Sequence, residues 1–162
     1  MYPGLSKGYD TLFDLMPDIK DATVLDLACG DGAFSRKCLT KGVASVDGYD
    51  ISSMMIDKAI KDANNEHRLV FKVADIEKLD LPVNRYNVVH SQFGLHYVSD
   101  LPSMMNRIAK SLKPGGIFVA TSYINSCIDS GLILEKFLEW GPDIGTKVTP
   151  YAVMIRARKS NN

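Results

Sequence analysis

Short apolar segments alternate with amphipathic ones along most of this sequence, and the alternation limits the folds open to it. Residues 23–28 are almost uninterruptedly apolar, as expected for a strand that is buried on both faces. Further strands are predicted over residues 44–49, 69–74, 86–90 and 117–121, with helices between them. Strands that alternate with helices indicate a parallel sheet covered by helices.

Helical periodicity fills the intervals between these strands. Helices are predicted over residues 10–16, 33–39, 53–63 and 101–112, because their apolar residues recur at helical spacing. Ser52 is a suitable N-cap for the third of these helices.

The later part of the chain is less regular. The sequence Lys-Pro-Gly-Gly at residues 113–116 predicts a turn before the fifth strand. Residues 124–131 predict a short helix, whereas residues 132–140 fit either a helix or a strand. We favour the strand, because Gly131 is typical of a helix C-terminus and a second helix directly after it would be crowded. A last strand is predicted over residues 151–157.

Composition excludes several classes of protein. A chain of 162 residues is expected to form a single domain over residues 1–162. Its 19 Lys and Arg residues balance its 19 Asp and Glu residues, without the basic surplus of a dedicated nucleic-acid binder. No apolar run approaches the roughly 20 residues that cross a bilayer, and no secretory signal is visible at the N-terminus. The three cysteines are odd in number and lack nearby histidines, which predicts reduced thiols, no metal site and a cytoplasmic protein.

Three carboxylates stand within or directly after the first three strands. Asp26 lies inside the first, Asp50 follows the second and Asp75 follows the third. Each has a structural interpretation as well: Asp26 would cap the following turn, Asp50 would begin a helix, and Asp75 would form a turn. Together, on one edge of a parallel sheet, they predict a site for a nucleoside-like ligand that carries positive charge.

A Gly-x-Gly turn follows the first strand at Gly30 and Gly32. Glycines let the backbone approach a ligand closely, and the N–H groups at a helix start can receive an anionic group. The dinucleotide-binding fingerprint of NAD enzymes continues to a third Gly or Ala, where this chain has Ser35. The acid within the strand is also unneeded there, so an NAD-dependent oxidoreductase is disfavoured.

Four motifs in order resemble one known family. They are Val-Leu-Asp-Leu-Ala-Cys-Gly-Asp-Gly at 24–32, Gly-Tyr-Asp-Ile-Ser at 48–52, Ala-Asp-Ile at 74–76 and Leu-Lys-Pro-Gly-Gly at 112–116. Their order and spacing resemble the class I S-adenosylmethionine-dependent methyltransferases. The resemblance implies an α/β fold of the Rossmann-like, doubly wound type. It implies a mostly parallel sheet of about seven strands, the last one antiparallel, with helices on both faces.

The resemblance also implies the residues that would bind S-adenosyl-L-methionine as cofactor. These are Asp26, Ala28, Gly30, Gly32, Asp50, Ile51, Met55, Asp75, Ile76 and Ser91. Asp26 and the glycine turn would hold the amino-acid part, Asp50 the ribose hydroxyls and Asp75 the adenine amino group. Three apolar side chains, Ile51, Met55 and Ile76, would enclose the adenine ring. Ala28 departs from the family's commoner glycine by a single methyl group.

The segment 87–98 is similar to the branch of the family that acts on small molecules. It lacks the Asn-Pro-Pro-Tyr signature of nucleic-acid amino methyltransferases, and the chain has no Pro-Cys pair for attack on a pyrimidine ring. A small-molecule acceptor is therefore expected, with no nucleic-acid or membrane partner. Within this segment His96 and Tyr97 are the candidate catalytic residues, although a partly buried structural role explains each equally well.

Two functions remain open. The residues after 121 leave little room for the acceptor-binding insertion that family members commonly carry. In the first hypothesis the protein is an active methyltransferase. The loop 91–100, the N-terminal segment, a second copy in a homodimer or a partner protein then completes its acceptor site. In the second, it is a cofactor-binding module without independent catalysis.

Overall fold

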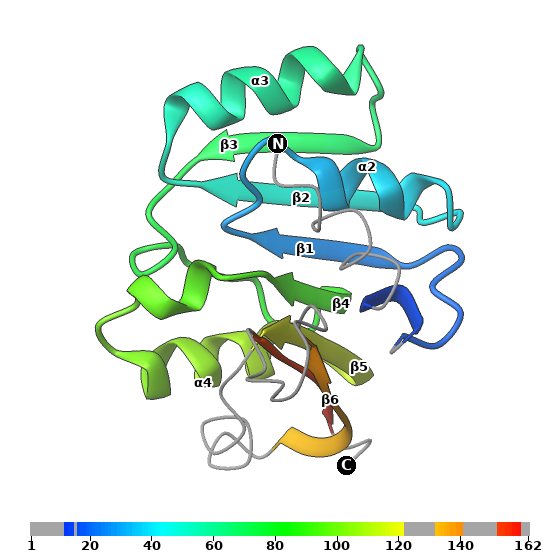
Figure 1. Ribbon diagram of the computed structural model, residues 1–162, viewed down its shortest axis with the longest axis vertical. Coiled ribbons are helices and arrows are strands. Elements are labelled where there is room, and N and C mark those ends of the chain that lie inside the picture. Colours follow the sequence, from blue (N-terminus) through cyan, green and yellow to red (C-terminus); the bar gives the residue numbers. More distant parts are fainter. Residues whose placement is uncertain (1–11, 15, 122–131, 141–151, 160–162) are drawn as a thin grey trace, which may run out of the picture.

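The computed structural model describes residues 12–14, 16–121, 132–140 and 152–159. They contain a single seven-stranded sheet with the order β3-β2-β1-β4-β5-β7-β6 (Figure 1). Its strands are β1 (Thr23–Leu27), β2 (Ser45–Asp50), β3 (Leu69–Val73), β4 (Tyr86–Ser91), β5 (Leu112–Thr121), β6 (Leu132–Trp140) and β7 (Ala152–Lys159).

The predicted fold class is confirmed. Strands β1 to β5 are parallel, β7 is antiparallel to β5, and β6 is antiparallel to β7. The chain runs outward from β1 through β2 to β3, then returns to place β4 on the other side of β1. In sheets of this type ligands bind where the strand order reverses, outside the carboxyl ends of the strands. For this chain that point lies between β1 and β4.

Four helical segments are described besides one turn at residues 12–14: α2 (Ala33–Leu39), α3 (Ser53–Ala63), the 3-10 helix η1 (Gly94–Tyr97) and α4 (Leu101–Ser111). The bounds of α3 are those predicted, because its start is set locally. The Ser52 hydroxyl accepts a hydrogen bond from the Met55 backbone N–H at 3.3 Å, as an N-cap does.

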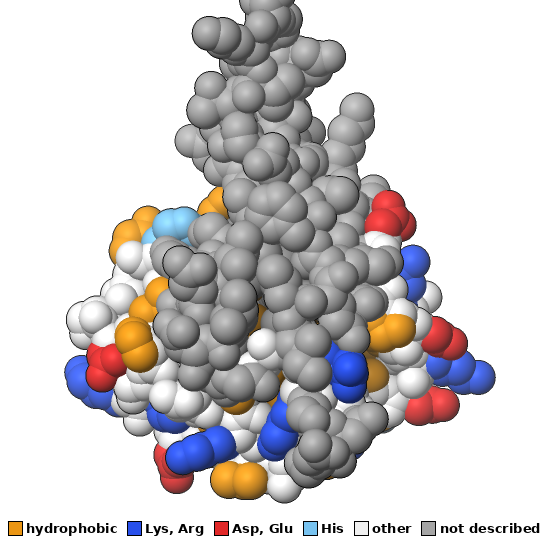
Figure 2. All heavy atoms as spheres, turned by 90° about the horizontal axis from the view of Figure 1, so that it is seen from below, with side chains coloured by type: hydrophobic (Ala, Val, Ile, Leu, Met, Phe, Trp, Pro, Cys, Tyr) orange, Lys and Arg blue, Asp and Glu red, His pale blue; other side chains and the backbone are white. Residues whose placement is uncertain are grey.

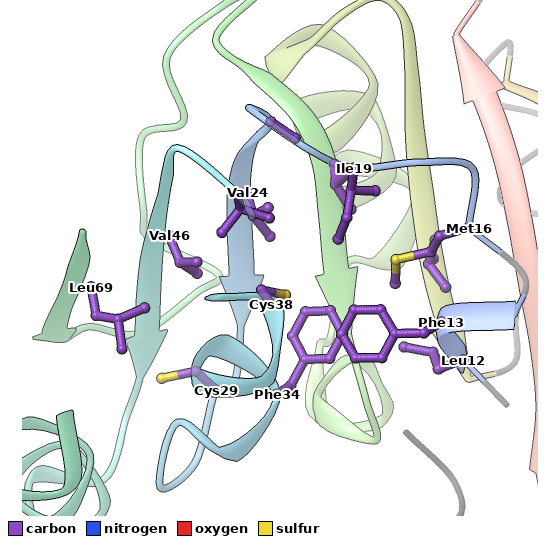
Figure 3. Packing of buried hydrophobic residues seen from close by; sticks show 14 of the residues in the cluster. Leu12, Phe13, Met16, Ile19, Val24, Cys29, Phe34, Cys38, Val46 and Leu69 are labelled. Atoms are coloured by element: carbon purple, nitrogen blue, oxygen red, sulfur yellow. The ribbon is translucent and has the colours of Figure 1, made fainter. Parts of the chain in front are cut away.

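Helices cover both faces of the sheet. On one face α2 and α3 pack on β1 and β2 through a cluster that includes Val24, Phe34 and Val46. The ring of Phe34 stacks on Phe13 at 5.3 Å between centroids, so the N-terminal turn closes this side (Figure 3). On the other face α4 packs on Leu25 and its neighbours through a second cluster. Because side chains alternate along β1, Asp26 shares the face of Val24.

The predicted turn at residues 113–116 is corrected by the structure. These residues belong to β5, where pairing with β4 passes from Tyr86 opposite Leu112 to Val88 opposite Ile117. The extra residues form a bulge. Gly116 is needed in it, because an added Cβ would lie 2.9 Å from the Lys113 carbonyl oxygen.

The strand preferred for residues 132–140 is confirmed as β6. The helix predicted over residues 124–131 lies outside the described residues. Among the described helices, none has the length and apolar character needed to cross a membrane.

Candidate cofactor and active site

A pocket of ≈ 380 Å³ lies at the carboxyl ends of β1 to β4. Six residues predicted for the site line it: Ala28, Asp50, Ile51, Asp75, Ile76 and Tyr97. They come from four separate segments of the chain. The fold therefore brings together the strand-end residues that the sequence motifs indicated.

Asp50 ends β2 and joins two neighbouring segments. Its Oδ2 accepts a hydrogen bond from the Gly30 backbone N–H at 2.8 Å, and its Oδ1 accepts one from Ser52 at 2.9 Å. The carboxylate thus fixes the glycine turn against the start of α3. Carboxylate oxygens have further lone pairs, so Asp50 can still accept hydrogen bonds from a ligand in the pocket.

Asp75 stands beside Asp50 because the Ala74 backbone N–H donates to the Asp50 carbonyl at 2.9 Å. Oδ2 of Asp75 lies 3.0 Å from the Lys78 ammonium, and Oδ1 of Asp75 accepts a hydrogen bond from the Glu77 backbone N–H at 3.0 Å. The hydrogen bond from Lys78 is the main reason that the pKa of Asp75 is below its usual range. Asp75 is therefore an ionised acceptor at neutral pH.

The far wall of the pocket is held by contacts between distant segments. Glu77 Oε1 accepts hydrogen bonds from both the backbone N–H and the hydroxyl of Ser99, each at 2.6 Å. Arg107 of α4 donates to the Ile76 carbonyl at 3.3 Å. At the mouth the Ile51 and Tyr97 side chains are exposed, by 72% and 87%. Exposed apolar surface at a pocket mouth is suited to a flat, apolar ring.

A smaller pocket of ≈ 170 Å³ adjoins the first. The two share Ala28, Gln92 and Phe93 in their walls. The remaining walls of the smaller pocket are Asp26, Cys29, Gly30, Asp31, Phe34 and His90. A ligand longer than a nucleoside can therefore extend from one pocket into the other.

Asp26 is buried in the wall of the smaller pocket with two side-chain partners. Its Oδ2 accepts a hydrogen bond from the Ser35 hydroxyl at 2.5 Å, and its Oδ1 lies 2.8 Å from Nδ1 of His90. Asp26 is 1% exposed and His90 is 2% exposed. The His90 ring stacks on Phe34, with 3.6 Å between centroids. The strand carboxylate is therefore part of a buried Ser–Asp–His cluster.

The boundary between the two pockets carries unusual backbone geometry. Ala28 has a φ of 58° and Phe93 a φ of 62°, values that side chains with a Cβ adopt at a cost. A Cβ added to Gly94 would overlap the Ala28 methyl group. The methyl group that distinguishes Ala28 from the family's commoner glycine is thus accommodated by a glycine at position 94.

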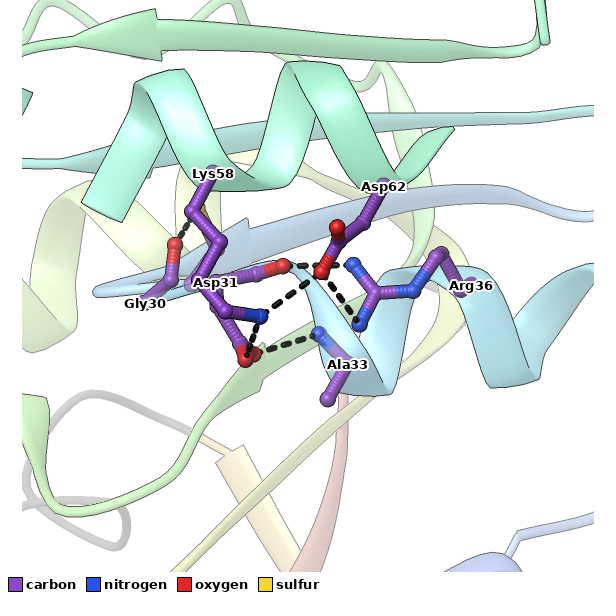
Figure 4. Close-up of polar contacts among 7 residues, drawn as sticks. Gly30, Asp31, Ala33, Arg36, Lys58 and Asp62 are labelled. Carbon is purple, nitrogen blue, oxygen red and sulfur yellow. Dashed lines mark hydrogen bonds and ion pairs between the residues drawn. The ribbon is translucent and has the colours of Figure 1, made fainter. Parts of the chain in front are cut away.

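The glycine turn also contacts side chains of α2 and α3 (Figure 4). Asp31 Oδ2 lies 2.8 Å from the Lys58 ammonium, which also contacts Asp62 at 2.7 Å. Arg36 of α2 donates to the Asp31 carbonyl at 2.5 Å. Each pair is partly exposed and contributes little to stability alone, but together the contacts fix the path of the turn.

Four predicted site residues lie outside the walls of these two pockets. Gly32 caps α2 with a φ of 73°, and an added Cβ would lie 2.6 Å from the Phe71 ring. Ser91 is buried at the end of β4, and Met55 is 39% exposed on α3. His96 is exposed, with Nδ1 at 3.2 Å from the Phe93 carbonyl oxygen. Their roles at the site remain predictions.

The sequence reasoning missed several residues of the site, above all His90. A polar residue within an otherwise apolar strand was a signal that could have identified it, as it did for Asp26. The two are directly opposite in the β1–β4 pairing. Among the described residues, no group of three or more His, Cys, Asp or Glu side chains is arranged to hold a metal ion.

Comparison with known proteins agrees with this geometry. Residues 24–116 match the methyltransferase domain family. An uncharacterized protein of Haemophilus influenzae is 33% identical over 78% of this chain and 52% of its own length. Phosphoethanolamine N-methyltransferase 3 of Arabidopsis thaliana is 33% identical over 75% of this chain and 24% of its own length. The chain thus spans from about a quarter to about half of these relatives.

The fold is shared with a solved S-adenosylmethionine-dependent methyltransferase from Mesorhizobium loti. That structure superposes with a TM-score of 0.83 at 22% sequence identity, and the match covers 93% of this chain and 96% of the other. The family match includes β1 to β4 and every motif quoted above. The chain therefore belongs to the methyltransferase domain family, and its fold is that of the class I S-adenosylmethionine-dependent methyltransferases.

Proposed function

We propose that this protein transfers the methyl group of S-adenosylmethionine to a small-molecule acceptor. The observation that carries the proposal is the pair of adjoining pockets at the carboxyl ends of β1 to β4. Asp50 and Asp75 line one pocket and Asp26 and His90 line the other. Carboxylates placed around a site favour a ligand that carries positive charge.

The residues present fit this cofactor. Asp50 would accept hydrogen bonds from the ribose hydroxyls, and Asp75 would accept one from the adenine amino group. Ile51 and Ile76 line the larger pocket and would contact the faces of the adenine ring. The smaller pocket would hold the amino-acid part, because it adjoins the larger one and carries Gly30 in its wall.

The bound cofactor supplies a methyl group on a positively charged sulfur, which an acceptor atom can attack in line. The protein's own residues bind and orient the cofactor and the acceptor, and they exclude water. Such alignment can account for much of the rate. Tyr97 lies at the pocket mouth with its side chain exposed, where it would contact the acceptor. We retain His96 and Tyr97 as the candidate residues beside the acceptor.

Two observations support a small acceptor. The sequence has no net charge, and Figure 2 shows acidic and basic side chains around the margin of the described surface on one face. A nucleic-acid binder would be expected to carry a field of positive charge there. In addition, a relative is by its name a phosphoethanolamine N-methyltransferase, which acts on a small amine.

We infer that the chain acts as one domain, because the described strands form one continuous sheet. The acceptor site would be closed by the loop 91–100, which borders the pocket through Phe93, Tyr97 and Val98. In the alternative arrangement, a second copy in a homodimer or a partner protein completes the acceptor site.

The transfer reaction is tested with cofactor that carries a labelled methyl group. Purified protein is incubated with small-molecule extracts, and the products are separated to find label in a new compound. We expect label to appear with wild-type protein and to be lost in Asp50→Ala. Cofactor binding without transfer, with and without candidate partner proteins, would contradict the proposal. It would favour a cofactor-binding module.

A further inference from the structure

We propose that His90 is a cofactor-binding residue. In this proposal its Nε2 accepts a hydrogen bond from the ammonium group of the cofactor's amino-acid part, and Asp26 is the positioning residue behind it. The inference rests on the proposed cofactor site. It adds a residue for which neither the sequence motifs nor the family match gives a role.

The fold places His90 and Asp26 side by side. The two residues are directly opposite in the parallel pairing of β4 with β1, so their side chains project from the same face of the sheet. Nδ1 of His90 lies 2.8 Å from Oδ1 of Asp26, and both side chains are almost fully buried. The contact is therefore shielded from water. A charge-assisted hydrogen bond is stronger in such a buried environment than in water.

The partners of Asp26 determine which imidazole nitrogen carries the proton. An ionised carboxylate only accepts hydrogen bonds, and the Ser35 hydroxyl donates to its other oxygen at 2.5 Å. Opposite an ionised Asp26, Nδ1 of His90 is the donor to Oδ1. In the neutral ring this leaves Nε2 with a free lone pair, which is an acceptor.

Nε2 of His90 is buried and has no hydrogen-bond partner within the part of the chain that the structure describes. Such atoms are rare in folded proteins, because their loss of hydration is not repaid. The ring has little freedom to turn away, since Phe34 stacks on it at 3.6 Å and Phe34 in turn stacks on Phe13. The unused acceptor is thus held in a fixed orientation.

His90 lines the smaller pocket, which adjoins the proposed adenosine pocket through Ala28, Gln92 and Phe93. A ligand with adenosine in the larger pocket would extend its remaining part into the smaller one. A neutral acceptor backed by a buried carboxylate selects a cationic donor over an anion. The α-ammonium of the cofactor is the group with that chemistry, and it would give Nε2 its missing partner.

The test compares two ligands that differ in the amino-acid part. S-adenosylhomocysteine carries that part, whereas 5′-methylthioadenosine has the adenosine and sulfur without it. Binding of both is measured by calorimetry with wild-type protein, with His90→Asn and with His67→Asn. In His90→Asn the shorter amide can still donate to Asp26, but nothing occupies the place of Nε2. His67 is an exposed control, with 91% of its side chain accessible.

We expect His90→Asn to weaken binding of S-adenosylhomocysteine by about tenfold or more and to leave 5′-methylthioadenosine unchanged. Equal weakening of both ligands, or of neither, would overturn the proposal and leave the cofactor site intact. If the wild-type protein bound neither ligand, the proposed function itself would fail.

Nitrogen NMR of the histidine side chains gives a second measurement on the wild-type protein, independent of any variant. It should show a proton on Nδ1 of His90, the nitrogen that faces Asp26. The Nε2 resonance should move when S-adenosylhomocysteine is added and stay in place with 5′-methylthioadenosine. An Nε2 resonance that ignores both ligands at saturation would also overturn the proposal.

Discussion

Ala28 and Gly94 are complementary residues at the boundary between the two pockets. Ala28 adopts a φ of 58°, which costs an alanine about 1–2 kcal/mol relative to its usual conformations. Its methyl group lies where a Cβ on residue 94 would be. Each residue therefore limits what the other position accepts.

This contact predicts a strong coupling between two substitutions. Gly94→Ala should lower the free energy of unfolding by about 1–3 kcal/mol through overpacking, and most of that loss should be recovered in the Ala28→Gly background. Urea unfolding of the wild-type protein, both single variants and the double variant measures the coupling. Additive effects of the two changes would show that the methyl group is not the obstacle.

The buried thiols give a prediction about pH. Burial raises the pKa of both Cys29 and Cys38 well above the usual range, and the negative charge of Asp26 adds to the shift. Because a raised pKa lowers the thiolate fraction at any given pH, neither thiol should react with iodoacetamide in the native protein at pH 8. Both should react in urea.

Mass-spectrometric mapping of the alkylated peptides checks this result residue by residue. Rapid native labelling of Cys38, which is fully buried, would contradict the packing of α2 against the sheet.

At the scale of elements, α3 connects local sequence to the site. Its N-terminus follows Asp50 directly, and the Asp50 carboxylate accepts the Ser52 backbone N–H at 2.9 Å. The Ser52 hydroxyl in turn accepts the Met55 N–H. The helix start and the pocket wall are therefore held by the same few hydrogen bonds.

Loss of this cap has a measurable cost. Ser52→Ala should lower the free energy of unfolding by about 1 kcal/mol, because a helix N–H loses its partner. The neighbouring Ser53→Ala is the matched control, since Ser53 is exposed within the helix and alanine favours that conformation. Thermal or urea unfolding compares the two, and equal effects would show that the Ser52 hydroxyl is not the cap.

The elements that the sequence predicted well are those whose determinants are local. The bounds of α3 follow from its N-cap and its helical periodicity. β1 follows from a nearly continuous apolar run, which is typical of a strand that is buried on both faces. Residues 113–116 were predicted as a turn and instead form a bulge. The bulge could not be predicted locally, because its form depends on the pairing of β5 with β4. Turn-forming residues alone do not distinguish the two outcomes.

At the scale of the whole molecule, the strand order determines which residues meet. Asp50 and Asp75 could be assigned to one edge from the sequence, because parallel strands end on the same side. His90 could not be assigned as easily, since its partner Asp26 is 64 residues away and becomes a neighbour only when β4 lies beside β1. Long-range pairing, more than residue type, limited the prediction of the site.

The same arrangement joins the two halves of the site through a single set of strands. The larger pocket is lined from the ends of β2 and β3 and from the segment after β4, the smaller one from β1 and β4, and Ala28, Gln92 and Phe93 belong to both. A substitution at Asp50 should therefore affect cofactor binding without disturbing the sheet order.

We expect these adjoining pockets to bind S-adenosylmethionine through Asp50. Calorimetric titration of S-adenosylhomocysteine into wild-type protein, Asp50→Ala and Asp57→Ala tests it most directly; Asp57 is an exposed carboxylate on α3. We expect tight binding to wild type and Asp57→Ala, and binding about 10- to 100-fold weaker in Asp50→Ala. No binding to the wild-type protein, or equal affinity in all three, would contradict the account.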